Sequence, residues 1–552
     1  MEEEKYIVAL EIGSSKIKGA IGTVDASGAL SVKAVEEEKL TDAVRYGCIR
    51  NVVETTTAIR DVINRLEQRE PQRKVTGVYV SVGGRSLMAQ DIEIERRLPS
   101  DMEITNDLIA DMTAEALGYQ LHERSIIGVT PKEFRVDNLP TRAPVGTFGS
   151  HVSARLNLIS CRNQLMRNLN VVCDERLHLN VNDIFVRPLV EADLVLYPEE
   201  KRQGCMLVDF GADTTTVSIY KNGVLVYLST IPMGSRNITR DITALNYLEE
   251  RAEELKIEGG NAFVVNEPMG NPYTTGVDFN MINNYVSARA GEIIANVNEQ
   301  IKYAGLTSDK LPAGIVLVGR GSKLTGFDQR LGNQTTMKVR FGSPVNRLRI
   351  LDGRVNATDH VDVISILAAA ARDRNVRECM GRLTPEHAYT APTQPVQPQQ
   401  PTYQQGSYQY PYQQQAPQQP APAQAQQPYQ AAAPAASPYQ PQQPQQPQQP
   451  QQAAEQQPYQ PQAPAQQQYQ QPQQSVQPQA TPREGYQQRP SNPYGEQARN
   501  ITVQTGQEQP QPSAPQAPRT GGFGRAWNAL RNRVVSLMTE PVEDDEPDND
   551  DR

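Results

Sequence analysis

The chain has 552 residues, a formal net charge of −9 at pH 7, five cysteines and 38% hydrophobic residues. It has no apolar run of the roughly 18 residues that a membrane-spanning helix needs, and its opening, MEEEKYIVALEIG, lacks the pattern of a secretion signal. Mild acidity without a basic stripe in the globular part argues against nucleic acid as a partner. The cysteines, which show no CxxC spacing, indicate buried thiols in a reducing cytoplasm, so we expect any membrane contact to be peripheral.

The first elements are predicted to be two strands joined by a tight turn. KYIVALEIGSSKIKGAIGTV has the pattern of a strand, a Gly13-Ser14-Ser15 turn and a second strand. TTTAIRDVINRLEQRE has the apolar spacing of a helix, and KVTGVYVSVGG is typical of a strand that ends in a glycine turn. We expect a helix-and-strand insertion from about 85 to 165.

The same design recurs in the second half of the chain. GCMLVDFGADTTTVSIYKNGVLVYLSTIPMG predicts a strand, a glycine turn and a strand, extended by the hairpin signal NGV. AGIVLVGRGSKLTGF predicts a buried strand, broken by Gly319-Arg320-Gly321 and followed by a helix. Two halves that begin alike predict a duplicated α/β architecture with a cleft between two lobes, within a globular domain at 1–387.

Composition changes abruptly after the globular domain. Residues 388–518 consist largely of Pro, Gln, Ala and Tyr in units such as PQQP and PYQ, which cannot bury enough apolar area to fold. We therefore expect a disordered linker there, a short helix at 519–540 and a solvated acidic tail at 541–552.

The segment 519–540 predicts an amphipathic helix. Apolar side chains recur at spacings of three or four, and arginines accompany them: Phe523, Arg525, Trp527, Leu530, Arg531, Arg533, Val534, Leu537 and Met538. This pattern is typical of a helix that lies in the interface of an anionic lipid membrane. The alternative is that the helix docks in a groove of another protein or on its own globular domain. Because a linker of about 130 residues separates the two, docking on its own domain is entropically unfavourable.

Two similar turns carry the chemistry of the globular domain. In LEIGSSK, Glu11 ends a strand before a glycine and two hydroxyl residues, and in VDFGADT, Asp209 stands at the matching point. Glycine lets backbone N–H groups converge on an anion, and a carboxylate beside each turn can hold Mg²⁺, directly or through water. Either turn alone is typical of an ordinary hairpin. The pair, followed by GIVLVGRGSKLTGF, favours a clamp for a triphosphate and its metal.

This ordered set resembles the actin, Hsp70 and sugar-kinase superfamily, and the globular region is similar to the bacterial cell-division family FtsA. The insertion and the segments IPMGSRNITRDI, AEELKIEGGNA and SARAGEIIANV carry the closer resemblance. It implies an actin-like two-lobe α/β fold with duplicated phosphate hairpins and an FtsA-type inserted subdomain. The second lobe would span about 204–350, with a smaller subdomain at about 236–309, and a linker and membrane-targeting helix would follow.

The resemblance also implies ATP and Mg²⁺ as cofactors and gives roles to individual residues. The phosphate-binding residues would be Gly13, Ser14, Ser15, Lys16, Gly211, Ala212, Asp213 and Thr214. The adenosine-binding residues would be Arg236, Glu253, Lys256, Gly319, Arg320 and Gly321, of which the first three are also typical of a solvated helix face. Glu11 and Asp209 would be the metal-binding residues, directly or through water.

Three positions depart from the family pattern. Glu11 stands where relatives usually have Asp, the turn Gly-Ala-Asp-Thr replaces Gly-Gly-Gly-Thr or Gly-Gly-Gly-Ser, and Arg320 replaces a second glycine. Asp213 would repel a phosphate unless it is turned away or bridged by a metal. No catalytic residue is assigned: Glu191 and Asp193 are candidates for orienting a water, with an ordinary helix start as the preferred interpretation. We therefore expect ATP binding with at most slow hydrolysis.

The resemblance implies four kinds of partner. The C-terminal tail of the tubulin-like FtsZ would bind the smaller subdomain at about 236–309, and further copies of the chain would form filaments. The other two partners would be the anionic lipid of the inner membrane at the division site and the later division proteins. Because one short helix binds lipid weakly, a polymer that presents several helices would hold FtsZ at the membrane.

Two other functions stay open at this point. A pilus or secretion adaptor of related fold would bind ATP beneath a membrane, but it would not normally carry its own lipid helix. A sugar-kinase-like phosphotransferase would need a carboxylate aimed at a substrate hydroxyl, and it has no use for a leash and a membrane helix.

Overall fold

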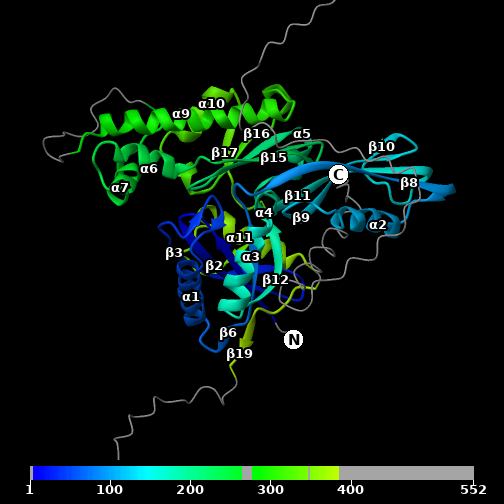
Figure 1. The fold of residues 1–552 in the computed structure, drawn as a ribbon, viewed down its shortest axis with the longest axis horizontal. Coiled ribbons are helices and arrows are strands. Elements are labelled where there is room, and N and C mark those ends of the chain that lie inside the picture. Colours follow the sequence, from blue (N-terminus) through cyan, green and yellow to red (C-terminus); the bar gives the residue numbers. More distant parts are fainter. Residues whose placement is uncertain (1–3, 264–276, 346–347, 374, 384–552) are drawn as a thin grey trace, which may run out of the picture. The chain divides into compact units, whose positions relative to one another are not determined.

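The computed structural model describes residues 4–263, 277–345, 348–373 and 375–383, and every element below lies in these ranges (Figure 1). The predicted linker at 388–518, the helix at 519–540 and the tail at 541–552 lie outside the described residues.

The first lobe is built on a six-stranded sheet with the order β12-β7-β1-β2-β3-β18. Its strands are β1 (Lys5–Ile12), β2 (Lys16–Val24), β3 (Leu30–Lys39), β7 (Gly77–Val82), β12 (Asn180–Val186) and β18 (Arg349–Ile350). The antiparallel run β1-β2-β3 continues through the parallel pairs β1-β7 and β7-β12. Strands β1, β2 and β7 are buried along nearly their whole length, which is typical of a sheet covered on both faces.

The second lobe repeats this topology. Its sheet has the order β15-β14-β13-β16-β17, with β13 (Cys205–Phe210), β14 (Thr215–Lys221), β15 (Val224–Ile231), β16 (Gly314–Val318) and β17 (Val339–Phe341). Again an antiparallel run of three strands continues through two parallel pairs, β13-β16 and β16-β17. Five strands of the first sheet, β3-β2-β1-β7-β12, have the same order as the five strands of the second, and β18 is added beyond β3. The shared order confirms the duplicated α/β architecture.

Helices cover both sheets. The first lobe carries α1 (Val52–Arg69), α3 (Asn163–Asn170), the π-helical turn η1 (Val171–Arg176), α4 (Arg187–Val195), η4 (Ala357–Asp359) and α11 (Val361–Ala371). The second carries α5 (Pro198–Gln203), α6 (Ser235–Thr243), α7 (Glu249–Gly259), α9 (Phe279–Tyr303), η2 (Ser308–Lys310), η3 (Arg320–Lys323) and α10 (Phe327–Thr335). Helix α1 begins three residues before the predicted start because the side chain of Asn51 caps it by accepting from the backbone N–H of Glu54.

The predicted strand KVTGVYVSVGG is two strands in the structure. β6 (Arg73–Val75) pairs with β19 (Met380–Arg382), whereas β7 joins the main sheet. A short ladder of β4 (Val44–Arg45) and β5 (Cys48–Ile49) precedes α1. The apolar pattern runs through both strands, so it does not reveal that they have different partners.

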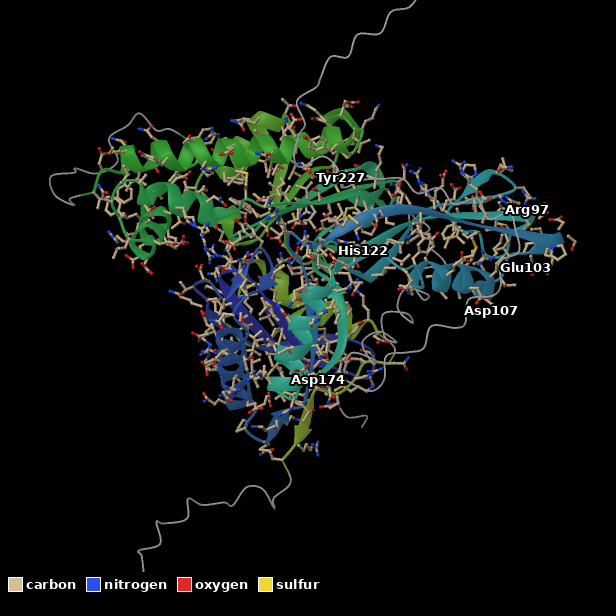
Figure 2. All side chains as sticks on the ribbon, viewed as in Figure 1. Arg97, Glu103, Asp107, His122, Asp174 and Tyr227 are labelled. Carbon is tan, nitrogen blue, oxygen red and sulfur yellow. The ribbon has the colours of Figure 1, made fainter. Side chains whose placement is uncertain are left out.

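An inserted sheet separates β7 from β12. Its order is β10-β9-β11-β8, with β8 (Met88–Glu103), β9 (Arg124–Val136), β10 (Leu139–Thr141) and β11 (Phe148–Arg162), and α2 (Asn106–Leu117) packs on it. Figure 2 labels Arg97 and Glu103 on the long strand β8 and Asp107 on α2. The insert has its own hydrophobic cluster, and the buried Asn157 on β11 donates to the carbonyl of Leu225 on β15, 2.8 Å away.

Two further hydrophobic clusters hold the lobes. One joins the first sheet to α1, α4 and α11, and the other joins the second sheet to α6, α9 and α10. Tyr227 on β15, labelled in Figure 2, donates its hydroxyl to Gln300 on α9 over 2.9 Å. These clusters hold β1 and β13 in place, and the two predicted phosphate turns follow directly after these strands.

Candidate functional site

Both predicted turns form as tight hairpins at equivalent places in the two sheets. The backbone N–H of Gly13 donates to the carbonyl of Lys16 at 3.0 Å, and that of Gly211 donates to the carbonyl of Thr214 at 2.9 Å. A Cβ added at either glycine would lie 2.9 or 3.0 Å from the same carbonyl oxygen, so the turns depend on glycine for their close backbone approach.

Helix α6 brings the two hairpins together. Its first amides donate to the second hairpin, Ser235 N to the Gly211 carbonyl at 3.0 Å and Arg236 N to the Ala212 carbonyl at 2.8 Å. The Arg236 side chain then reaches the first hairpin, where Nη2 donates to the carbonyl of Ser14 at 2.9 Å. Arg236, expected beside the adenosine, thus lies against both phosphate turns.

The carboxylate of Asp213 is turned away from the turn that carries it. It accepts from the backbone N–H of Tyr46 at 3.1 Å and forms ion pairs with Arg236, at 3.2 Å, and with Arg45, at 3.5 Å. Its side chain is 2% exposed, so its charge is balanced almost entirely by these two guanidinium groups. This geometry explains how an acidic residue can stand in a turn where phosphate is expected.

The adenosine-side glycines lie beside the end of β13. Gly319 has φ +83°, and a Cβ there would lie 2.5 Å from Oδ1 of Asp209. Arg320 does not extend along this loop, since its Nη1 pairs with Glu37 at 2.9 Å. Lys16 pairs with Glu37 as well. Glu37 therefore links a predicted phosphate-binding residue, Lys16, to a predicted adenosine-binding residue, Arg320.

The buried Lys256 and the partly exposed Glu253 form a hydrogen-bonded network with α6. Lys256 Nζ lies 2.6 Å from Glu253 Oε2 and donates to Thr239 Oγ1 at 3.0 Å. Although burial alone would raise it, the Lys256 ammonium holds the pKa of Glu253 below its usual value. The pair therefore fixes α7 against the helix that carries Arg236.

Glu11 and Asp209, the expected metal-binding residues, are bridged by the guanidinium of Arg187. Nη1 lies 2.8 Å from Glu11 Oε1, and Nη2 lies 3.2 Å from Asp209 Oδ2. Burial, together with the nearby Asp362, raises the pKa of Glu11 to about 7, and burial also raises the pKa of Asp209. Although burial opposes it, the charges of Asp209 and Glu11 hold the pKa of Arg187 above its ordinary value.

This donor set does not fit a bound Mg²⁺ ion. Mg²⁺ needs oxygens in near-ideal octahedral geometry, and here one oxygen of each carboxylate is already engaged by a guanidinium. In the part of the chain that the structure describes, no group of three or more His, Cys, Asp or Glu side chains could hold a metal ion. A metal held by Glu11 and Asp209, directly or through water, therefore stays a prediction, and this arrangement of contacts does not favour it.

Arg187 and Glu191 belong to the segment FVRPLVEADLVL that connects the lobes. Glu191, one turn further along α4, is buried with its Oε1 3.8 Å from Arg187 Nε, and burial raises its pKa well above the usual value. Asp193 instead pairs with Lys201 at 2.6 Å, outside this cluster. Sequence reasoning missed Arg187, Arg45 and Glu37 as residues of the site. The one available signal concerned Arg187, which stands directly before the proline at a predicted helix start.

Comparisons with known proteins agree with this architecture. The family model described as cell division protein FtsA matches residues 206–368, and the model for the SHS2 domain inserted in FtsA matches residues 84–160. FtsA of Porphyromonas gingivalis is 32% identical over 346 residues, which cover 60% of this chain and 72% of that protein. FtsA of Neisseria meningitidis serogroup B is 28% identical over 387 residues, covering 67% and 91%.

Among solved structures, the PilM-PilN type IV pilus biogenesis complex is similar at 15% identity and a TM-score of 0.48, covering 66% of this chain and 98% of that one. A likeness at this level does not bear on function. The helices in the described ranges include none long and apolar enough to cross a membrane, and all nine predicted membrane-binding residues, from Phe523 to Met538, lie outside the described residues. The curated relatives and the matches to the models for FtsA and its inserted domain show that the chain belongs to the FtsA family of cell-division proteins.

Proposed function

We propose that the chain binds ATP at its paired hairpins, assembles with itself beneath the inner membrane at the division site, and tethers FtsZ filaments there through its C-terminal helix, recruiting later division proteins. The observation that carries this proposal is the meeting of two equivalent glycine hairpins, joined by Arg236 and Asp213. Turnover is at most slow in this proposal, and no residue is assigned to catalysis.

Nucleotide binding has support from the chemistry at the hairpins. Arg236 reaches both turns and Arg45 pairs with Asp213 of the second turn. The proposed phosphate-binding groups are Gly13, Ser14, Ser15 and Lys16 of the first turn and Gly211, Ala212, Asp213 and Thr214 of the second. Backbone N–H groups of such turns and guanidinium forks are the donors that proteins use for phosphate. Adenosine would lie towards Gly319 and Gly321, with Glu253 and Lys256 holding the neighbouring helices.

A pair of glycine variants tests the nucleotide site without altering charge. A Cβ at Gly234 would lie 2.3 Å from the Ala212 carbonyl oxygen and 2.7 Å from Thr214 N, so Gly234→Ala should deform the second hairpin. Gly353→Ala is the matched control, because a Cβ there meets nothing within 4 Å. Calorimetry should show ATP binding lost or weakened at least about tenfold in Gly234→Ala alone. Equal ATP affinity in both variants would contradict the site.

The proposed binding surface for the FtsZ tail lies in the smaller subdomain. A hollow of about 310 Å³ is lined there by Ala244, Leu245, Asn246, Tyr247, Asp278, Met281 and Tyr285. Met281 is 49% exposed and Leu248 beside the hollow is 78% exposed, so apolar anchors for a peptide are available.

Peptide binding tests this surface directly. A fluorescent peptide of the FtsZ C-terminal tail should bind the full chain, and Met281→Glu should weaken it at least about tenfold. Ile257→Glu is the matched control, since Ile257 is 74% exposed on α7 and does not line the hollow. Equal loss in both variants, or none in either, would place the tail elsewhere.

Membrane binding through residues 519–540 is tested with the chain's single tryptophan. Trp527 fluorescence should shift to the blue on anionic liposomes, and the shift should increase with ATP as assembly adds helices. Val534→Glu on the apolar face should abolish the shift, whereas Asn532→Glu, placed on the opposite face by helical spacing, should leave it. An unchanged spectrum with intact ATP binding would favour protein docking of this helix.

A further inference from the structure

The bridge between Glu11 and Asp209 suggests how the nucleotide site is neutralised. We propose that Arg187 stands where a divalent cation would otherwise link these two carboxylates, so that this chain binds ATP with nearly the same affinity with and without Mg²⁺. The proposal rests on the nucleotide binding proposed above. In this proposal Arg187 is the residue that makes Mg²⁺ dispensable for ATP binding.

The guanidinium reaches one carboxylate from each lobe. Arg187 is the first residue of α4, Glu11 lies near the end of β1, and Asp209 lies in β13. Separate nitrogen atoms, Nη1 and Nη2, make the two contacts at 2.8 and 3.2 Å. A planar guanidinium presents its donors in a fixed fork, so one arginine can hold two carboxylates at a constant separation.

Packing holds this guanidinium in place. A Cβ at Gly83 would lie 2.8 Å from Cζ, Nε and Nη2 of Arg187, so the group rests against the backbone at the end of β7. On another side it meets Glu191, whose Oε1 is 3.8 Å from Nε. The side chain of Arg187 is 14% exposed, compared with 5% for Glu11 and 10% for Asp209. All three charges are therefore largely withdrawn from water.

A divalent cation between these carboxylates would lie against a buried positive charge. Arginine does not lose its proton in proteins, so Arg187 cannot make room for the ion by becoming neutral. Beside it, the ammonium of Lys18 is paired with the carboxylate of Asp362 at 2.6 Å, and Glu191 is a further buried carboxylate next to the guanidinium. A metal held by Glu11 and Asp209 would have to compete with this guanidinium for the carboxylate oxygens that it already engages, Oε1 of Glu11 and Oδ2 of Asp209.

Other arginines supply the positive charge that a polyphosphate needs. Arg236 and Arg45 already surround the carboxylate of Asp213 at the second hairpin, at 3.2 and 3.5 Å. Arginine recognises phosphate through paired N–H donors. Together Arg236 and Arg45 carry one positive charge more than Asp213 neutralises, so part of the nucleotide charge can be balanced at the hairpins by side chains of the protein itself.

Calorimetry on the wild-type full chain tests the proposal, with ATP titrated in excess EDTA and again in excess MgCl₂. The two dissociation constants should agree within about threefold. Binding seen only with Mg²⁺ would overturn the inference while leaving the proposed function intact. Binding in neither condition would overturn the proposed nucleotide site, and this inference with it.

Variants of Arg187 test whether this side chain is responsible. Arg187→Gln should weaken ATP binding in EDTA by about tenfold or more, and Mg²⁺ should restore it, because the unbridged carboxylates then accept a cation. Arg155→Gln is the control, since Arg155 also forms an ion pair, with Asp91 at 2.6 Å, and lies on β11 of the inserted sheet. If Arg187→Gln binds as the wild type does in both conditions, the role given to Arg187 is wrong. If that variant does not unfold cooperatively in urea, the wild-type comparison still decides.

Discussion

Replacing Asp213 by asparagine should make the protein less stable and at the same time a better binder of ATP. Asp213 is the acidic residue in the second phosphate turn, and its carboxylate is held by Arg236, Arg45 and the backbone N–H of Tyr46. Asparagine keeps the shape and an acceptor for the Tyr46 N–H, but it removes the negative charge. The substitution therefore separates the charge of Asp213 from its hydrogen bonding.

The expected loss of stability follows from burial. Removing one partner of a buried ion pair costs about 3–5 kcal/mol. The cost here should be about 2–3 kcal/mol, because the asparagine side chain can still accept from the Tyr46 N–H and Arg236 still donates to the Ser14 carbonyl. Asp241→Asn is the matched control: Asp241 pairs with Arg289 in the same lobe with 27% of its side chain exposed, so its loss should cost about 0–1 kcal/mol.

The expected gain in affinity follows from repulsion. At an effective dielectric constant of about 20, two unit charges about 8 Å apart interact by about 2 kcal/mol, so loss of the Asp213 charge should tighten ATP binding about thirtyfold. Urea unfolding and ATP calorimetry on wild type, Asp213→Asn and Asp241→Asn measure both effects. If Asp213→Asn matches the control in stability, or binds ATP no better than wild type, the electrostatic reasoning at this hairpin fails.

Three further outcomes are expected. Asn51→Ala removes the cap of α1 and should lower the free energy of unfolding by about 1 kcal/mol in urea titrations, and a loss below a few tenths would show that the cap contributes nothing. Leu66→Ala should cost about 2–5 kcal/mol in the same assay, because Leu66 is fully buried between α1 and the first sheet, and a near-neutral change would contradict that packing. Burial and the Lys18 ammonium lower the pKa of His360 from 6.5 to about 4, with Asp362, Glu37 and Arg320 also facing it. Since the unfolded chain binds the proton more tightly, stability should fall as pH drops from about 6.5 to 4, and His360→Gln should remove that part of the pH dependence; an unchanged pH profile would refute it.

Local elements of the fold could be predicted well from the sequence. The two glycine hairpins, the helix α1 and the strand β16 with its Gly319 turn have strong short-range signals, because turn chemistry and apolar spacing are local properties. The repetition of strand, turn and strand was enough to predict the duplication, which the order shared by five strands of each sheet confirms. The division of KVTGVYVSVGG into two strands could not be predicted, since it depends on pairing with β19 more than 300 residues away along the chain.

The electrostatics of the candidate site could be predicted only in part. The conflict at Asp213 was visible in the sequence, but its solution depends on Arg45 and Arg236, which are 168 and 23 residues away from it. The bridge by Arg187 was not predicted at all, because it joins residues of β1, α4 and β13 that only the tertiary fold brings together. A carboxylate beside a glycine turn indicates an anion or metal site, and the sequence does not show that a guanidinium already satisfies it.

Co-flotation tests the central proposal most directly. The purified full chain would be mixed with FtsZ of the same organism and anionic liposomes, with and without ATP, and spun through a density gradient. We predict that with ATP both proteins float with the liposomes, and that Gly234→Ala leaves FtsZ at the bottom while Gly353→Ala does not. If FtsZ stays at the bottom with the wild-type chain and ATP, the chain is not the membrane tether that we propose.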